Sequence, residues 1–155
     1  MYICQHNFLA INSSTIYFNI MYACSISLGD EVVMTGGGDG RGALASVTRY
    51  NIRGWGEGMP SLVTGRHSHG CTRFISGGEQ VRHYDAAHKY SFPCPQVLLV
   101  TGGWDDDFNS LDSTELLRPG SVWQEITARL PRPMSYMSVS TVDNRVLLFG
   151  EWRHC

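Results

Sequence analysis

A short apolar pattern that ends in small residues occurs three times along this chain of 155 residues. The copies read GDEVVMTGGG at 29–38, QVLLVTGGW at 96–104 and NRVLLFGEW at 144–152. Each contains a β-branched or leucine-rich run, which predicts a short strand buried on both faces. The glycine pairs that follow the first two runs permit a positive φ or a close approach of another backbone. The chain is therefore expected to fold as a series of similar β-units.

The sequences downstream of the two glycine pairs also agree. Counted from the second glycine of each pair, SVTRYNI at 46–52 and DSTELLR at 112–118 lie at the same distance. An arginine follows at an equal distance in both copies, Arg66 in the first and Arg132 in the second. Agreement at several independent distances indicates an internal repeat.

Six residues of the repeat receive structural roles. The glycine pairs are expected to end the strands. A tryptophan follows in each copy, two residues out of step between the copies, and is expected to pack between neighbouring units. These structural residues are Gly36, Gly37, Gly102, Gly103, Trp55 and Trp123.

The spacing between the copies reveals an insertion. Thr35 and Thr101 are 66 residues apart, whereas Thr101 and Phe149 are 48 apart. Removing the sixteen residues at 81–96 shortens the longer spacing to 50. The codons at both ends permit exon–intron boundaries, so one hypothesis is a translated intron and the other is a long loop between two strands. Both predict an intact unit, because closing a loop costs only about 0.6 kcal/mol per doubling of its length.

A period of about fifty residues with short β-runs and glycine-rich turns is typical of one four-stranded propeller blade. The patterns VVMTGGG…SVTRYNI…W…R and VLLVTGG…DSTELL…W…R resemble the kelch-repeat family, over roughly 22–152. Leu116 departs from the pattern where Tyr50 predicts an aromatic residue, and Glu151 replaces the second glycine of the third copy. The resemblance implies an all-β fold, an incomplete kelch-type β-propeller of about two to three blades of antiparallel strands.

The resemblance also divides the chain. Residues 22–152 form the expected kelch-repeat region, with the insertion at 81–96. Residues 1–21 form an N-terminal segment that is not clearly part of the repeat, and 153–155 a truncated tail. Two blades cannot close a ring, and their open faces leave apolar side chains in water at about 1.5–3 kcal/mol each. Self-association through open blade faces is therefore a further candidate.

Composition limits the partner and the compartment. The 12 lysine and arginine residues are scattered and the net charge is −2, which argues against a nucleic-acid partner. Five cysteines without a CxxC spacing argue against a zinc site and a disulfide framework, so reduced thiols are expected. The N-terminal segment lacks a positive start and an unbroken apolar run, so we expect no signal peptide and no membrane span, which favours the cytoplasm.

Three short motifs are candidate ligand sites, and each has a simpler interpretation. GRHSHGC places His67, His69 and Cys71 at alternating strand positions, but no fourth zinc ligand is indicated, and ordinary strand packing is favoured. WDDDFNS at 104–110 lacks the alternating oxygens of a calcium loop. GGGDGRG at 36–42 lacks the Gly-Lys-Ser/Thr ending of a phosphate loop. We therefore expect no metal and no cofactor.

The resemblance also implies where a protein partner would bind. In kelch-like receptors, arginines of the corresponding loop and residues after the glycine pair line the partner surface. The contact candidates here are Arg66, Arg132, Trp104, Asp105, Asp106 and Asp107. For the two arginines, packing on a tryptophan or on a carboxylate of the next blade is the structural alternative. No Ser-His-Asp, Cys-His or paired-carboxylate arrangement indicates a catalytic residue.

The leading interpretation is a non-enzymatic protein–protein interaction module that presents blade-end loops to a protein partner. In the kelch family, such propellers serve as the substrate-recognition part of a ubiquitin ligase adaptor when a BTB domain precedes them. Two alternatives stay open: a fragment of a galactose oxidase-like copper enzyme, and an inert truncated gene product without a stable fold.

Overall fold

All regular structure in the described part of the chain is β-structure. The computed structural model describes residues 20–51, 54–55, 58–75 and 96–150. These residues form ten strands and no helix, so none of them provides a helix that could span a membrane. Every strand pair is antiparallel. The prediction of an all-β fold with antiparallel strands is confirmed.

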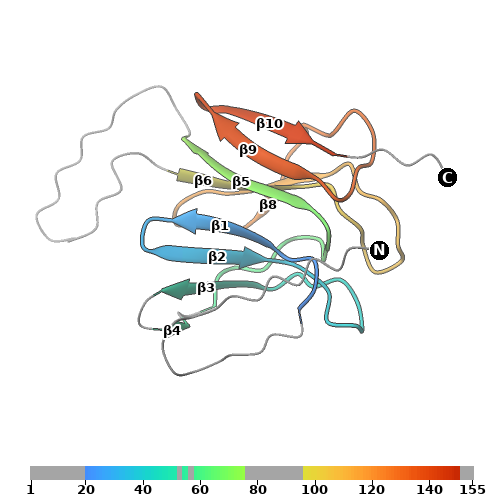
Figure 1. Cartoon of the computed structure of the whole chain (residues 1–155), viewed down its shortest axis with the longest axis horizontal. Coiled ribbons are helices and arrows are strands. Elements are labelled where there is room, and N and C mark those ends of the chain that lie inside the picture. The colour runs from blue at the N-terminus through green and yellow to red at the C-terminus, as the bar shows by residue number, and fades with distance from the viewer. Residues whose placement is uncertain (1–19, 52–53, 56–57, 76–95, 151–155) are drawn as a thin grey trace, which may run out of the picture.

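The strands form two four-stranded sheets and one hairpin (Figure 1). In both four-stranded sheets, neighbours in space are neighbours in sequence. The first sheet contains β1 (Cys24–Leu28), β2 (Glu31–Thr35), β3 (Val47–Asn51) and β4 (Gly54–Trp55). The second contains β5 (Gly70–Ile75), β6 (Gln96–Thr101), β7 (Thr114–Leu117) and β8 (Gln124–Glu125). The hairpin contains β9 (Ser138–Val142) and β10 (Arg145–Phe149).

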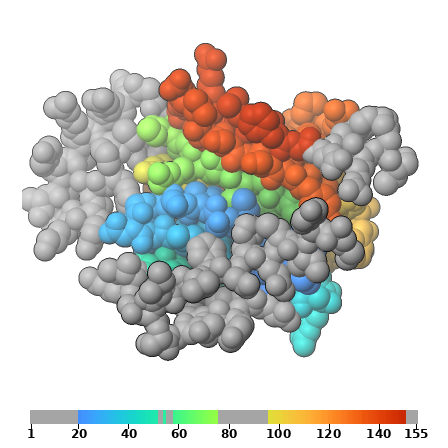
Figure 2. Space-filling view, in the orientation of Figure 1, coloured from blue at the N-terminus to red at the C-terminus, as the bar shows by residue number. Residues whose placement is uncertain are grey.

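The sequence repeat is a structural repeat of three units. Thr35, Thr101 and Phe149 are equivalent, because each ends a strand and pairs with the first residue of the strand before it. The first strands β1, β5 and β9 lie side by side, and Figure 2 shows them as successive bands across one face. The three copies of the apolar pattern therefore occupy the same place in three similar units.

A series of backbone hydrogen bonds joins the units just before their first strands. The amide of Ser68 donates to the carbonyl of Tyr22 over 2.9 Å, and the amide of Tyr136 donates to the carbonyl of Ser68 over 2.8 Å. All three residues have a positive φ, of 59°, 54° and 52° in chain order. The same local geometry recurs at each entry to a unit, which fixes the units relative to one another.

The glycine pairs have the structural role that the sequence predicted. All four glycines have a positive φ, which side chains rarely tolerate. A Cβ on Gly36 would clash with the carbonyl oxygen of Arg66, and one on Gly102 would clash with that of Met134. Backbone from the following loop therefore packs directly on each strand end, and only glycine leaves room for it.

The main hydrophobic core lies between the two four-stranded sheets. Trp123 is buried there, among side chains of both sheets. The side chain of Trp55 lies outside the described residues. The core side chains are Ile26, Val33, Val47, Leu62, Cys71, Leu98, Val100, Leu117 and Trp123. A smaller cluster of Val97, Leu99 and Leu116 packs on the hairpin through Val146.

Burial of the three apolar strands differs from the sequence-based expectation. β6 is buried on both faces, as predicted, because the first sheet covers one face and the hairpin covers the other. In β2 only Val33 and Thr35 are buried, and β10 is largely exposed. The prediction of burial on both faces is therefore wrong for these two strands, since it requires a covering sheet on each side.

The inserted segment connects two adjacent strands of the second sheet. β5 and β6 are antiparallel neighbours joined through residues 76–95, which lie outside the described part of the chain. The corresponding strands of the other units are joined by the two-residue turns Gly29-Asp30 and Asp143-Asn144. Gln96, which the spacing assigned to the insertion, is the first residue of β6. The segment is thus a connection between two strands, and its origin as a translated intron stays a prediction.

A disulfide joins the first two units. Cys24 in β1 is bonded to Cys71 in β5, with 6.0 Å between their Cα atoms. The expectation of reduced thiols is wrong for these two cysteines. They are 47 residues apart in sequence, and only the side-by-side packing of β1 and β5 brings them together.

Candidate functional site

The loops that follow the glycine pairs meet at one end of the molecule, away from the hairpin turns (Figure 1). Backbone hydrogen bonds fix these loops to the residues that precede the first strands. Gly38 exchanges two bonds with Met21, of 2.7 and 2.8 Å, and Trp104 exchanges two with His67, of 2.9 and 3.1 Å. Both strand pairs thus continue past their strand ends and hold the loops in place.

Four rings gather at this end and form what we call the aromatic surface: Tyr22, His67, Phe108 and Tyr136. The centroid of Tyr22 lies 6.0 Å from that of His67 and 6.4 Å from that of Tyr136. The ring of Phe108 lies edge-on to His67 at 6.4 Å. Phe108 is 74% exposed and Tyr136 is 61% exposed. All three units contribute to this surface, which leaves large aromatic side chains in water.

Backbone strain accompanies the aromatic surface. Tyr22, Phe108 and Tyr136 have positive φ values of 59°, 58° and 52°. This conformation costs a bulky L-residue about 1–3 kcal/mol and persists only where surrounding contacts impose it. The loop hydrogen bonds supply those contacts, including one from the amide of Phe108 to the carbonyl of Asp105 over 3.2 Å. Strain of this kind concentrates at functional sites.

The three successive carboxylates lie in the loop that carries Phe108; we call Asp105–Asp107 the acidic loop. Asp105 accepts hydrogen bonds from the amides of Asp107 and Asn109, at 3.0 and 2.8 Å, and from the Asn109 side chain. The Asn109 side chain is the main cause that lowers the pKa of Asp105. Asp106 accepts a hydrogen bond from the amide of Ala43, in the loop between β2 and β3. Asp106 and Asp107 are exposed.

The acidic loop acts electrostatically on the aromatic surface. Partial burial lowers the pKa of His67, whereas the charges of Asp106 and Asp105 raise it. Trp104, which precedes the loop, is half-buried, and its indole nitrogen has no hydrogen-bond partner among the described residues. The structure therefore brings four of the six predicted contact residues, Trp104 and the acidic loop, to the edge of the aromatic surface.

Arg66 occupies a different place, because it is fully buried. Its guanidinium forms an ion pair of 2.6 Å with Glu115, which is also fully buried. The same group donates to the carbonyl of Gly102 over 2.9 Å and to the hydroxyl of Ser113 over 3.1 Å. Burial lowers the pKa of Arg66, and the charge of Glu115 opposes this change. Contact with a partner is therefore the wrong role for Arg66, and the structural alternative, a carboxylate of the next unit, is confirmed.

Arg132 is exposed and does not occupy the position of Arg66. In the first unit, the amide of Arg66 donates to the carbonyl of Leu44, and the carbonyl of Arg66 accepts from the amide of Gly37. In the second unit, the amide of Met134 donates to the carbonyl of Leu111, and the carbonyl of Met134 accepts from the amide of Gly103. Met134 is therefore the structural equivalent of Arg66. The second unit is longer by two residues, as the shift between Trp55 and Trp123 also shows.

His69 is buried beneath the site, beside Thr35. Its Nε2 lies 2.8 Å from the hydroxyl of Thr35, and its Nδ1 has no partner among the described residues. Burial, and secondarily the charge of Arg66, lowers the pKa of His69 to about 3. The sulfur of Cys71 belongs to the disulfide. No group of three or more potential metal ligands lies together in the described part of the chain.

The buried imidazole predicts a pH dependence of folding. Because the pKa of His69 is about 3 in the folded chain and near 6.5 when unfolded, the unfolded chain binds the proton first as the pH falls. The full contribution of His69 to the free energy of unfolding is therefore present above about pH 6.5. Below that pH, the free energy of unfolding falls by about 1.4 kcal/mol per pH unit. His69→Met, the residue of the equivalent position Met137, is expected to remove this slope. Urea unfolding between pH 7 and pH 4 measures it, and an unchanged slope in the variant would contradict the assignment.

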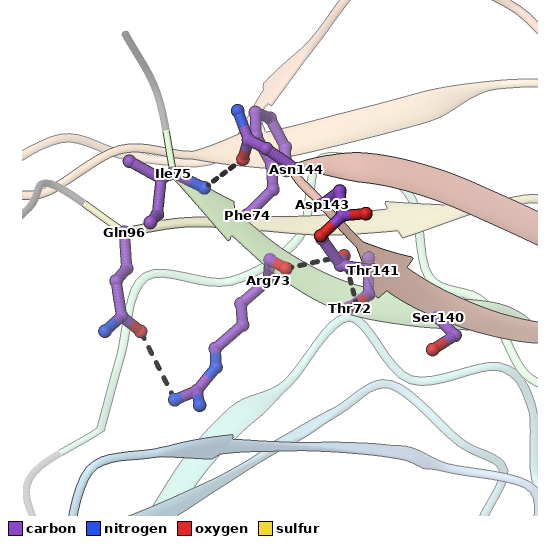
Figure 3. Close-up of a pocket in the computed structure, with 9 residues that line it drawn as sticks. All are labelled: Thr72, Arg73, Phe74, Ile75, Gln96, Ser140, Thr141, Asp143 and Asn144. Atoms are coloured by element: carbon purple, nitrogen blue, oxygen red, sulfur yellow. Dashed lines mark hydrogen bonds between the residues drawn. The ribbon is translucent and has the colours of Figure 1, made fainter. Parts of the chain in front are cut away.

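A groove of about 470 Å³ lies at the opposite end of the molecule, between β5 and the turn of the hairpin (Figure 3). Its polar groups bond to one another and to the neighbouring sheet. The carboxamide oxygen of Asn144 accepts from the amide of Ile75 over 2.8 Å, and the hydroxyl of Thr141 donates to the carbonyl of Arg73 over 2.7 Å. Arg73 also donates to the carbonyl of Ser27 over 2.7 Å. These bonds give the groove a structural role in joining the units.

The aromatic surface was not identified from the sequence. Its members are separated by up to 114 positions, from Tyr22 to Tyr136, and no short motif contains them. The only local signal was Phe108, a lone large apolar residue inside the polar stretch DDDFNS. No family model matches the chain, and no curated protein matches it.

Proposed function

We propose that this chain is a partial kelch-type β-propeller that binds a protein partner through the aromatic surface and the acidic loop. The observation that carries the proposal is the set of mutually oriented rings that three successive units bring to one end, two of which, Phe108 and Tyr136, are exposed. The loops are fixed by backbone hydrogen bonds, so the surface is formed before a partner arrives.

The repeat geometry supports the propeller assignment. Each four-stranded sheet follows the simple up-and-down order of a propeller blade, and first strands of successive units lie side by side. The glycine pairs end the second strands, and Trp123 lies between two sheets, as the kelch resemblance implies. A covering loop packs on each glycine pair and places its neighbours at the binding end.

The chemistry of the surface favours a protein ligand. Tyrosine and other aromatic residues are enriched in protein interfaces, where their large area is buried at a low cost in side-chain entropy. Burying one ring such as Phe108 is worth about 1.5–3 kcal/mol. The carboxylates of the acidic loop at its edge favour a partner segment that carries lysine or arginine. Recognition of a substrate within a ubiquitin ligase adaptor would be a special case of this activity.

The test compares two double variants of the full chain. Phe108→Ser with Tyr136→Ser removes both exposed rings, and Val63→Ser with Val122→Ser removes two similarly exposed apolar side chains elsewhere. With proximity labelling in cells of the source organism, the first variant is expected to lose the proteins enriched by the wild type. Two rings account for a roughly 100-fold or greater loss of affinity. Equal enrichment by the wild type and by the ring variant would contradict the proposal.

A further inference from the structure

The outer face of the hairpin is exposed, whereas the equivalent face of β6 in the second unit is covered. Leu147 and Leu99 are equivalent, since each lies two residues before the strand-end residue of its unit. Leu147 is 39% exposed, whereas Leu99 is 9% exposed. The exposed fractions of the strand-end residues differ more, since Phe149 is 60% exposed and Thr101 is 1% exposed. In the second unit the hairpin covers these positions, and no described residue does so for the hairpin itself.

Alternation along the hairpin identifies the outward side chains. Val146 packs toward the second sheet, so Leu147 and Phe149 point away from it. Val142 pairs with Arg145 and is exposed on the same outer face. The outer face of the hairpin therefore carries Val142, Leu147 and Phe149. It corresponds to the face of β6 on which Leu99 packs against the hairpin.

In the described part of the chain, no second sheet covers the outer face of the first sheet. Val33 points into the core toward the second sheet, so its neighbours Val32 and Met34 point the other way, and both are only half-buried. Their equivalents in the second unit, Leu98 and Val100, are buried against the first sheet. The face with Val32 and Met34 is therefore the kind of face that receives a preceding unit.

The backbone series that joins the units is also open at both ends. It runs from Tyr136 to Ser68 and from Ser68 to Tyr22. Among the described residues, the carbonyl of Tyr136 accepts no backbone hydrogen bond and the amide of Tyr22 donates none. The hairpin end thus offers an acceptor, and the first-sheet end offers a donor.

We propose that two copies of this chain associate head to tail, the outer face of the hairpin in one copy packing on the Val32–Met34 face of the other. The contact would continue the packing that already joins the three units, and it would place the Tyr22 amide of one copy at the Tyr136 carbonyl of the other. Because the two faces differ, the interface is heterologous. Two copies form a closed dimer when each hairpin packs on the other copy's Val32–Met34 face; otherwise the free faces bind further copies.

Light scattering coupled to size-exclusion chromatography tests the proposal. The wild type is expected to have at least twice the mass of one chain at high concentration. Leu147→Thr with Phe149→Thr, and separately Val32→Thr with Met34→Lys, are each expected to give single chains. An equimolar mixture of these two variants retains one intact pair of faces and is expected to give twice the mass of one chain and nothing larger. Val122→Thr, which alters neither face, is expected to behave as the wild type.

Two results would overturn the proposal. One is a wild type that remains a single chain at every concentration. The other is a Val32/Met34 variant that pairs with itself, because that behaviour belongs to a symmetric contact between two hairpins. A thermal melt checks that each variant is folded. Independently of the variants, hydrogen exchange of the β10 amides in the wild type must slow as concentration rises, and exchange that is independent of concentration also rejects the contact.

Discussion

Replacing Glu115 by glutamine is expected to lower the free energy of unfolding by about 3–5 kcal/mol, the usual cost of leaving a buried charge without its partner. One carboxylate oxygen accepts from Arg66 at 2.6 Å and from the amide of Thr64 at 3.0 Å, and the other accepts from the amide of Val63 at 2.7 Å. A glutamine retains one acceptor but turns its amino group toward a backbone donor. Because domains are stable by about 5–15 kcal/mol, this single change removes a large part of the stability. Urea unfolding monitored by circular dichroism measures it.

The chain contains two controls for this prediction. Arg129 forms exposed ion pairs with Asp112 and Glu125, and Arg129→Gln is expected to cost less than about 1 kcal/mol. Arg66→Met with Glu115→Thr removes both charges and installs the residues of the equivalent positions, Met134 and Thr48. This double variant is expected to be more stable than Glu115→Gln, because no uncompensated charge remains. A loss below about 1 kcal/mol for Glu115→Gln would show that the ion pair does not join the two sheets as described.

Removing the disulfide is expected to lower the free energy of unfolding by about 4 kcal/mol, from the chain entropy of a loop of this length. Cys24 and Cys71 are 47 residues apart, and the bond joins the first strands of two units. Cys24→Ala with Cys71→Ala is therefore expected to lower the melting temperature by roughly 8–16 °C. A reductant is expected to lower the melting temperature of the wild type similarly.

Mass spectrometry after alkylation of the unfolded chain provides the control. The bonded Cys24 and Cys71 are expected to be alkylated only after reduction. Cys94→Ser, outside the bonded pair, is expected to leave the melt unchanged. Five thiols alkylated without reductant, together with a melt that a reductant does not change, would contradict the bond.

Features that depend on neighbours in sequence could be predicted from the sequence. The apolar runs became β2, β6 and β10, and the glycine pairs ended the first two of these strands. The spacing placed the insertion between two strands, where the structure joins β5 to β6. Each of these features follows from local pattern or from the period of the repeat.

Features that depend on contacts between units could not be predicted. The partner of Arg66 is Glu115, 49 residues away, and nothing near either residue announces the pairing. Arg132 and Arg66 lie at the same distance in sequence from their glycine pairs. Because the second unit contains two additional residues, the structural equivalent of Arg66 is Met134 and not Arg132. Burial of β2 and β10 depended on which sheets cover them. The rings of the aromatic surface meet only because three units converge at one end.

The most direct test of the central claim, that the aromatic surface binds a protein partner, is photo-crosslinking from its exposed ring. Benzoylphenylalanine in place of Phe108 keeps an aromatic side chain at the site, and the same residue in place of Val122 probes another exposed position outside it. After irradiation in cells of the source organism, the chain labelled at 108 is expected to form a discrete adduct with a second, different protein, and the chain labelled at 122 is not. Equal adducts from both positions, or none from 108, would contradict the claim.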